Sequence, residues 1–160
     1  MSDHTIMRSV DAYGRFIEDM VAANAITPGE LLEISGGDLQ AHATADGNAV
    51  PLVALEDSTR ETAAGTKQID TDYPAADTVR AYVPAPGELL YMFLAAGENV
   101  SKGDVLTSDG AGALKAEAVT VDPTATSAQA VAADAMRFIA WEDVDNSAGT
   151  TRTRITVMRI

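Results

Sequence analysis

The sequence predicts a mainly β protein, a small β-barrel or β-sandwich of the β-tulip-like kind with long polar loops. Two patterns indicate this fold class. Short apolar runs alternate with period two, and glycine-containing turns separate them, which is typical of compact barrels and sandwiches. A chain of 160 residues is long enough to bury a core. We expect residues 26–160 to form a single β-rich domain, preceded by an N-terminal arm or short helix over residues 1–25.

The central stretch, residues 84–115, carries the pattern most clearly. Pro86 and Gly87 favour a turn, because proline fixes φ and glycine accepts a positive φ. Residues 88–94 then predict a strand with apolar side chains on both faces, so both faces should be buried. Shorter strands are expected after it, each set off by a turn that contains glycine: near residue 100, at 105–107 and at 113–115.

The pentapeptide Pro-Gly-Glu-Leu-Leu occurs twice, at residues 28–32 and 86–90. Each copy predicts a Pro-Gly turn that opens an apolar strand. The repetition fits an internal duplication and fits two independent uses of one good strand opener equally well. Further turns and strands are expected after the first copy: turns at 36–38 and 46–48, and strands at 39–43 and 50–55.

A long polar segment, residues 56–77, predicts a surface loop. Ile69 and Tyr73 are its isolated large apolar residues, and we expect them to anchor the loop to the core. The next segment, residues 78–83, alternates apolar and polar residues. It predicts a strand whose inward residues are Val79, Ala81 and Val83.

The last third of the chain predicts three strands, near residues 116–121, at 136–141 and at 150–160. Residues 127–135 are only weakly patterned and predict a loop or short helix. Residues 142–149 form an acidic loop. Because the final segment alternates over its whole length, we expect it to close the sheet.

The first 25 residues differ from the rest. Phe16, Ile17, Met20 and Val21 have helical spacing and predict a short amphipathic helix at about 13–23. Gly14 and the preceding polar residues fit an extended arm equally well. The segment is rich enough in apolar residues to need a partner, either its own domain or a neighbouring subunit. The candidate interface residues are Val10, Tyr13, Phe16, Ile17 and Met20.

Charge is the strongest compositional feature. The chain has 24 acidic and 11 basic residues, a net charge of −13, with 15 aspartates and only three lysines. Such a balance fits an ordinary acidic protein, and it is also typical of proteins adapted to molar salt, where self-repulsion is screened within roughly 3 Å at 1 M. It argues against nucleic-acid binding, since no basic stripe offsets the repulsion of phosphates. We also expect no membrane partner and no cleaved signal, because no apolar run approaches the roughly 20 residues that span a bilayer.

The residues that carry chemistry elsewhere are sparse here. Cysteine is absent, and the two histidines, His4 and His42, lie far apart in the sequence, which disfavours a metal site or an acid–base pair. No Gly-x-Ser-x-Gly motif occurs, and we expect no histidine to serve a serine as base. The acidic segments 70–72 and 143–146 could hold a hard cation, although solvated loops explain them better. We therefore expect no enzyme, catalytic residue, cofactor, metal or small-molecule substrate.

One motif resembles a carrier domain. Gly97-x-x-Val-x-x-Gly-Asp-x-Leu106 is similar to the turn and strand signature of biotinyl and lipoyl carriers, whose modified lysine lies at an exposed hairpin tip. Lys67, Lys102 and Lys115 do not match the sequence context of that lysine. We therefore read the motif as general barrel geometry and keep the carrier domain as an alternative.

The order of motifs over residues 26–160 resembles the small β-rich head decoration, or cement, proteins of tailed bacteriophages and related archaeal viruses. The segments that carry the resemblance are Pro28–Leu32, 51–57, 69–73, 79–82, Pro86-Gly87, 97–106, 110–114, 140–146 and 154–157.

The resemblance implies a structural virion protein that binds the outside of the major capsid protein lattice, typically as a homotrimer at three-fold positions, with no catalytic residue to transfer. It implies a location on the capsid surface after assembly in the host cytoplasm. The acidic composition then points to a virus of a halophilic archaeon. A tail or spike component of the same virion would share these features and stays an alternative.

Overall fold

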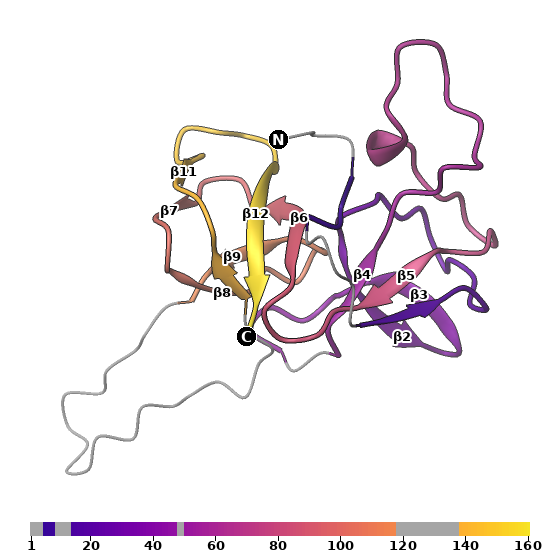
Figure 1. Cartoon of the computed structure of the whole chain (residues 1–160), viewed down its shortest axis with the longest axis horizontal. Helices are drawn as coiled ribbons and strands as arrows, with labels where there is room; N and C mark the ends of the chain where they lie inside the picture. The colour runs from indigo at the N-terminus through magenta and orange to yellow at the C-terminus, as the bar shows by residue number, and fades with distance from the viewer. Residues whose placement is uncertain (1–4, 9–13, 48–49, 118–137) are drawn as a thin grey trace.

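The computed structural model describes residues 5–8, 14–47, 50–117 and 138–160 (Figure 1). Within these residues the chain is mainly β and contains a closed five-stranded barrel beside a five-stranded sheet, which confirms the predicted fold class. The barrel order is β10 (Phe138–Ala140), β12 (Thr153–Arg159), β6 (Leu89–Leu94), β9 (Leu114–Ala116) and β8 (Val105–Ser108). The sheet order is β1 (Arg15–Ile17), β5 (Ala81–Val83), β4 (Leu52–Ala54), β2 (Leu31–Ser35) and β3 (Asp38–Ala41).

The predicted central strand, β6, lies in the wall of the barrel between β12 and β9. β6 pairs antiparallel with β12 from Leu89↔Met158 to Leu94↔Thr153. The inward residues of β6, Leu90, Met92 and Leu94, are fully buried, and they pack with apolar residues of the other barrel strands. On the other face of β6, arginine side chains lie over the rings of Tyr91 and Phe93. Both faces of the strand are therefore covered, as its pattern predicts.

The N-terminal segment is extended where the structure describes it. Residues 15–17 pair with β5, so the helical alternative is wrong at these positions. Gly14 permits this pairing, because a Cβ there would lie 2.1 Å from the Val83 carbonyl oxygen. Further along, the Ala22 N–H donates to the Asp77 carbonyl at 2.9 Å, and the Leu39 N–H donates to the Val21 carbonyl at 2.8 Å. Residues 21–23 thus link β3 to the segment before β5 and close the sheet around a second core.

Residues 5–8 lie against the barrel. The Tyr91 N–H donates to the Ile6 carbonyl at 2.7 Å, the Arg8 N–H donates to the Leu89 carbonyl at 2.8 Å, and Ile6 is fully buried. The described N-terminal residues therefore contact both halves of their own chain.

The polar segment 56–77 is a surface loop with the predicted anchors. Ile69, within the 3₁₀ turn η1 (Gln68–Asp70), and Tyr73 are both buried, and the Tyr73 hydroxyl donates to the Leu55 carbonyl at 2.7 Å. In β5 the inward prediction holds for Ala81, while Val83 is only half-buried. Tyr82 was expected to face outward but is fully buried. The reason is that β5 lies between two cores, the second core on one face and the barrel core on the other.

The remaining predictions concern the C-terminal third. The acidic loop contains one more strand, β11 (Val144–Asp145), which pairs with β7 (Asn99–Val100). The predicted strands at 136–141 and 150–160 correspond to β10 and β12. The helix or loop at 127–135 and most of the predicted strand at 116–121 lie outside the described residues.

Candidate interaction surface

The structure describes three of the candidate interface residues, Phe16, Ile17 and Met20, while Val10 and Tyr13 lie outside the described residues. Phe16 is 46% exposed. Ile17 and Met20 are partly buried and pack against the second core, whose buried residues are Ala22, Ile26, Leu32, Leu39, Leu52, Ala54, Tyr73, Val79 and Ala81. Of the three described residues, Phe16 therefore presents the most apolar surface to a partner.

Phe16 lies at the end strand of the sheet. Its ring packs against the ring of Tyr82, with centroids 4.9 Å apart, and the guanidinium of Arg80 lies 5.2 Å from its centroid. These contacts hold the ring in place while leaving almost half of it uncovered. Beside it opens a hollow whose apolar lining is Phe16, Ile17, Met20 and Val83, with Arg15, Glu18 and Asp19 at its border.

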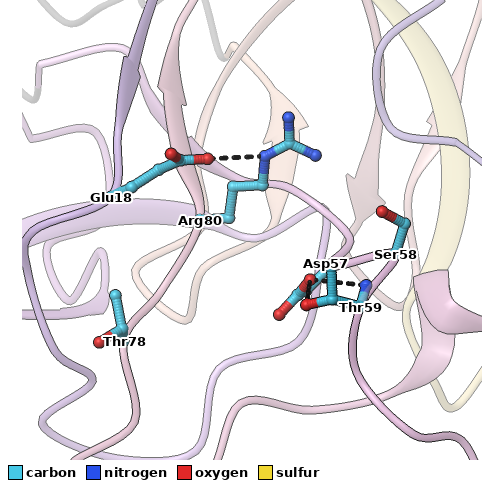
Figure 2. A pocket seen from close by; sticks show the side chains of 6 residues that line it. All are labelled: Glu18, Asp57, Ser58, Thr59, Thr78 and Arg80. Carbon is cyan, nitrogen blue, oxygen red and sulfur yellow. Dashed lines mark hydrogen bonds and ion pairs between the residues drawn. The ribbon is translucent and has the colours of Figure 1, made fainter.

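A second hollow, of about 400 Å³, shares Glu18 with the first. Figure 2 shows the residues that line it, which are polar or charged and come from three stretches of chain: Glu18, residues 57–59, Thr78 and Arg80. The Arg80 Nε–H donates to Glu18 Oε1 at 3.0 Å. Asp57 Oδ1 accepts hydrogen bonds from the Thr59 hydroxyl at 2.7 Å and from its N–H at 2.9 Å. These bonds hold the pKa of Asp57 below its usual value, so that this carboxylate stays charged.

Two arginines, Arg152 and Arg154, link the barrel to the sheet, and we call this pair the arginine seam. The guanidinium groups of Arg152 and Arg154 lie over the Phe93 ring, 3.9 and 4.1 Å from its centroid. Arg152 pairs with Glu30, and Arg154 donates to the Pro28 carbonyl at 2.8 Å. Burial raises the pKa of Glu30 against the opposing effect of Arg152, and burial lowers the pKa of Arg154. The seam is thus a structural link between the two halves.

His42 belongs to a buried hydrogen-bonded cluster. His42 Nδ1 and Ser108 Oγ are hydrogen-bonded at 2.7 Å, and His42 Nε2 lies 3.7 Å from a carboxylate oxygen of Glu33. Sequence reasoning missed this cluster because its members come from β2, β8 and the residue after β3, with no local signal. His42 is 1% and Ser108 2% exposed, so a substrate cannot reach the hydroxyl in this conformation. The cluster instead bridges the sheet to the barrel.

Residues of the two acidic segments that could hold a hard cation form hydrogen bonds and an ion pair within the chain. Asp145 Oδ1 accepts hydrogen bonds from the hydroxyl and N–H of Ser147, and the Asn146 side-chain amide donates to the Ala95 carbonyl at 3.0 Å. Asp70 pairs with Arg154 at 3.2 Å. Among the described residues no group of three or more metal-ligating side chains occurs. The same residues contain no helix long and apolar enough to cross a membrane.

No protein-family model matches the chain, and no curated protein matches it.

Proposed function

We propose that this protein is a capsid decoration protein, which binds the outside of the major capsid protein lattice and stabilises the head as a trimer. The ordered motifs that resemble head decoration proteins suggest the class. The observation in the structure that supports it best is Phe16, a firmly held aromatic ring left half exposed at the border of an apolar hollow. Such rings are the usual anchors of protein interfaces.

An apolar contact such as that of Phe16 is suited to binding in high salt. At molar salt, attraction between exposed charges is screened within roughly 3 Å. Contacts that must persist there rely on apolar burial and backbone pairing. Many identical contacts over a lattice stabilise the shell even when each one is modest.

Point substitutions test the role of Phe16 better than truncation does. Deleting residues 1–22 would remove the buried Ile6 and Ala22 and open the sheet, so a loss of binding would be ambiguous. We expect Phe16→Asp to lower the affinity for capsids by about tenfold or more, measured by co-sedimentation in molar salt.

The matched control is Ile34→Asp, which places the same charge at an exposed apolar position, 56% exposed, on the β2–β3 hairpin. Circular dichroism of both variants establishes that they fold. If both variants bind like the unmodified protein, Phe16 is not the anchor.

One observation keeps the carrier domain as a second candidate. Lys102 lies in the exposed turn between β7 and β8, with its ammonium 4.5 Å from the centroid of the Trp141 ring. A carrier domain predicts a mass increase on this lysine, so intact-mass measurement of protein from its native source separates the two functions. A decoration protein predicts the unmodified mass.

A further inference from the structure

The two hollows beside β1 form one surface with two different ends. Glu18 lines both of them. The apolar end presents Phe16, while the polar end presents Asp57, Arg80 and hydroxyl groups. A partner that fills the surface must therefore carry an apolar group next to a polar one.

Two carboxylates at the polar end can still accept hydrogen bonds from a positively charged group. Glu18 Oε1 and Asp57 Oδ1 are bonded within the chain, while the second oxygen of each carboxylate has no hydrogen-bond partner among the described residues. Arg80 is the basic group of this hollow, and its charge is already met by Glu18 at 3.0 Å. The lining therefore holds one negative charge in excess.

The charge of the whole chain points the same way. With 24 acidic and 11 basic residues, the molecule carries a net charge of −13, which attracts basic groups and repels acidic ones. A second copy of this chain is therefore a poor occupant, because it would bring the same excess of negative charge to an acidic hollow.

We propose, as an inference that rests on the proposed function, that this surface binds a segment of the coat protein in which a basic side chain lies beside an apolar one. The apolar side chain covers Phe16, and the basic side chain donates to the free oxygens of Glu18 and Asp57. Charge complementarity of this kind selects the partner and its orientation more than it adds affinity.

The test uses amide variants, which remove charge but keep the hydrogen bonds within the hollow. Glu18→Gln can still accept from Arg80, and Asp57→Asn can still accept from Thr59. Each variant should weaken capsid binding by about threefold at the lowest salt at which capsids stay intact. In molar salt the difference should shrink, because the pair is exposed and screened.

Two further variants test whether capsid affinity rises or falls with the negative charge of the hollow. Ser58→Asp adds a carboxylate at an exposed position of the polar hollow and leaves the contacts of Phe16 intact, so it should bind capsids at least as tightly as the unmodified protein. Glu61→Gln removes an exposed carboxylate elsewhere in the 56–77 loop and is the matched control, with no expected change.

The outcomes separate this inference from the proposed function. If the unmodified protein does not bind capsids, the proposed function fails. If it binds while Glu18→Gln and Asp57→Asn behave like Glu61→Gln, the inference alone fails. Weaker binding by Ser58→Asp together with tighter binding by the carboxylate variants would mean that the partner's group is acidic, which also overturns it.

Discussion

The two copies of Pro-Gly-Glu-Leu-Leu show what an identical sequence does in two regions of one molecule. In both copies glycine has a positive φ, 94° at Gly29 and 91° at Gly87. In both, the glutamate N–H donates to the carbonyl three residues earlier, and a glutamate oxygen accepts from that residue's N–H, at 3.1 Å for Glu30 and 2.8 Å for Glu88. Both carboxylates are buried.

The copies differ in the partners that the fold brings to each carboxylate. Glu30 pairs with Arg152, the residue before the barrel strand β12, and so ties the sheet to the barrel. Glu88 accepts from the Tyr82 hydroxyl at 2.7 Å and from the Gly14 N–H at 3.3 Å, and so ties the barrel to the N-terminal segment. The lesson is that a pentapeptide determines its own turn, whereas distant residues decide what its buried charge holds together.

The largest expected effect comes from removing the charge partner of the first copy. Arg152→Met leaves Glu30 buried without its guanidinium and should lower the free energy of unfolding by about 3 kcal/mol. Chemical denaturation of the variant and of the unmodified protein measures this loss. Glu30→Gln combined with Arg152→Met should recover part of the loss, because the buried charge is then gone. A loss below about 0.5 kcal/mol would show that Arg152, which is partly exposed, acts as an ordinary surface ion pair.

The two turn glycines give a matched pair of variants. Alanine at either position must adopt a positive φ, which costs about 1–2 kcal/mol. At Gly29 the added Cβ would also lie 2.5 Å from Arg154 Nη1 and 3.1 Å from the Tyr91 carbonyl, whereas nothing lies within 4 Å of it at Gly87. Gly29→Ala should therefore destabilise the protein more than Gly87→Ala does, by about 1 kcal/mol or more. Equal losses would contradict the close packing of the first turn against the barrel.

The second copy is tested at Tyr82. Tyr82→Phe removes the hydroxyl that donates to Glu88 and accepts from the Gly14 N–H at 2.8 Å. We expect a loss of about 1–2 kcal/mol in the free energy of unfolding, since a buried carboxylate then lacks one donor. An unchanged midpoint of chemical denaturation would mean that the other partners of Glu88 suffice.

The smallest effect is a dependence on alkaline pH. Burial, together with the hydrogen bond to Glu88, raises the pKa of Tyr82 from 10.0 to about 12. Between these values the unfolded chain loses the tyrosine proton while the folded chain keeps it, so the stabilisation by Tyr82 falls as the pH rises. The difference in the free energy of unfolding between the unmodified protein and Tyr82→Phe should therefore decrease from pH 10 to pH 12. A difference that stays constant over this range would contradict a stabilising role for the buried hydrogen bond.

The local patterns of the sequence predict much of this fold. A run that is apolar on both faces predicts β6, the Pro-Gly pairs predict both turns, and Ile69 and Tyr73 are recognisable as loop anchors. In each case the signal lies within a few residues. The burial of Tyr82 is not predictable in this way, because it depends on a second core that approaches β5 from the other face.

The candidate surface was less predictable than the fold. The N-terminal apolar spacing identifies Phe16, but the polar hollow of the same surface is lined by Asp57 and Arg80, which are distant from Phe16 in sequence. Likewise, His42 and Ser108 meet only because the fold brings the residue after β3 to the end of β8. Local spacing carries no information on such pairs.

Binding of the purified protein to capsids that lack it tests the account most directly, measured by sedimentation from low to molar salt alongside the protein's own oligomeric mass. We predict a trimer whose binding saturates and persists in molar salt, because apolar contacts supply most of the affinity. A protein that stays in the supernatant, or that leaves the capsid as the salt concentration rises, would contradict it.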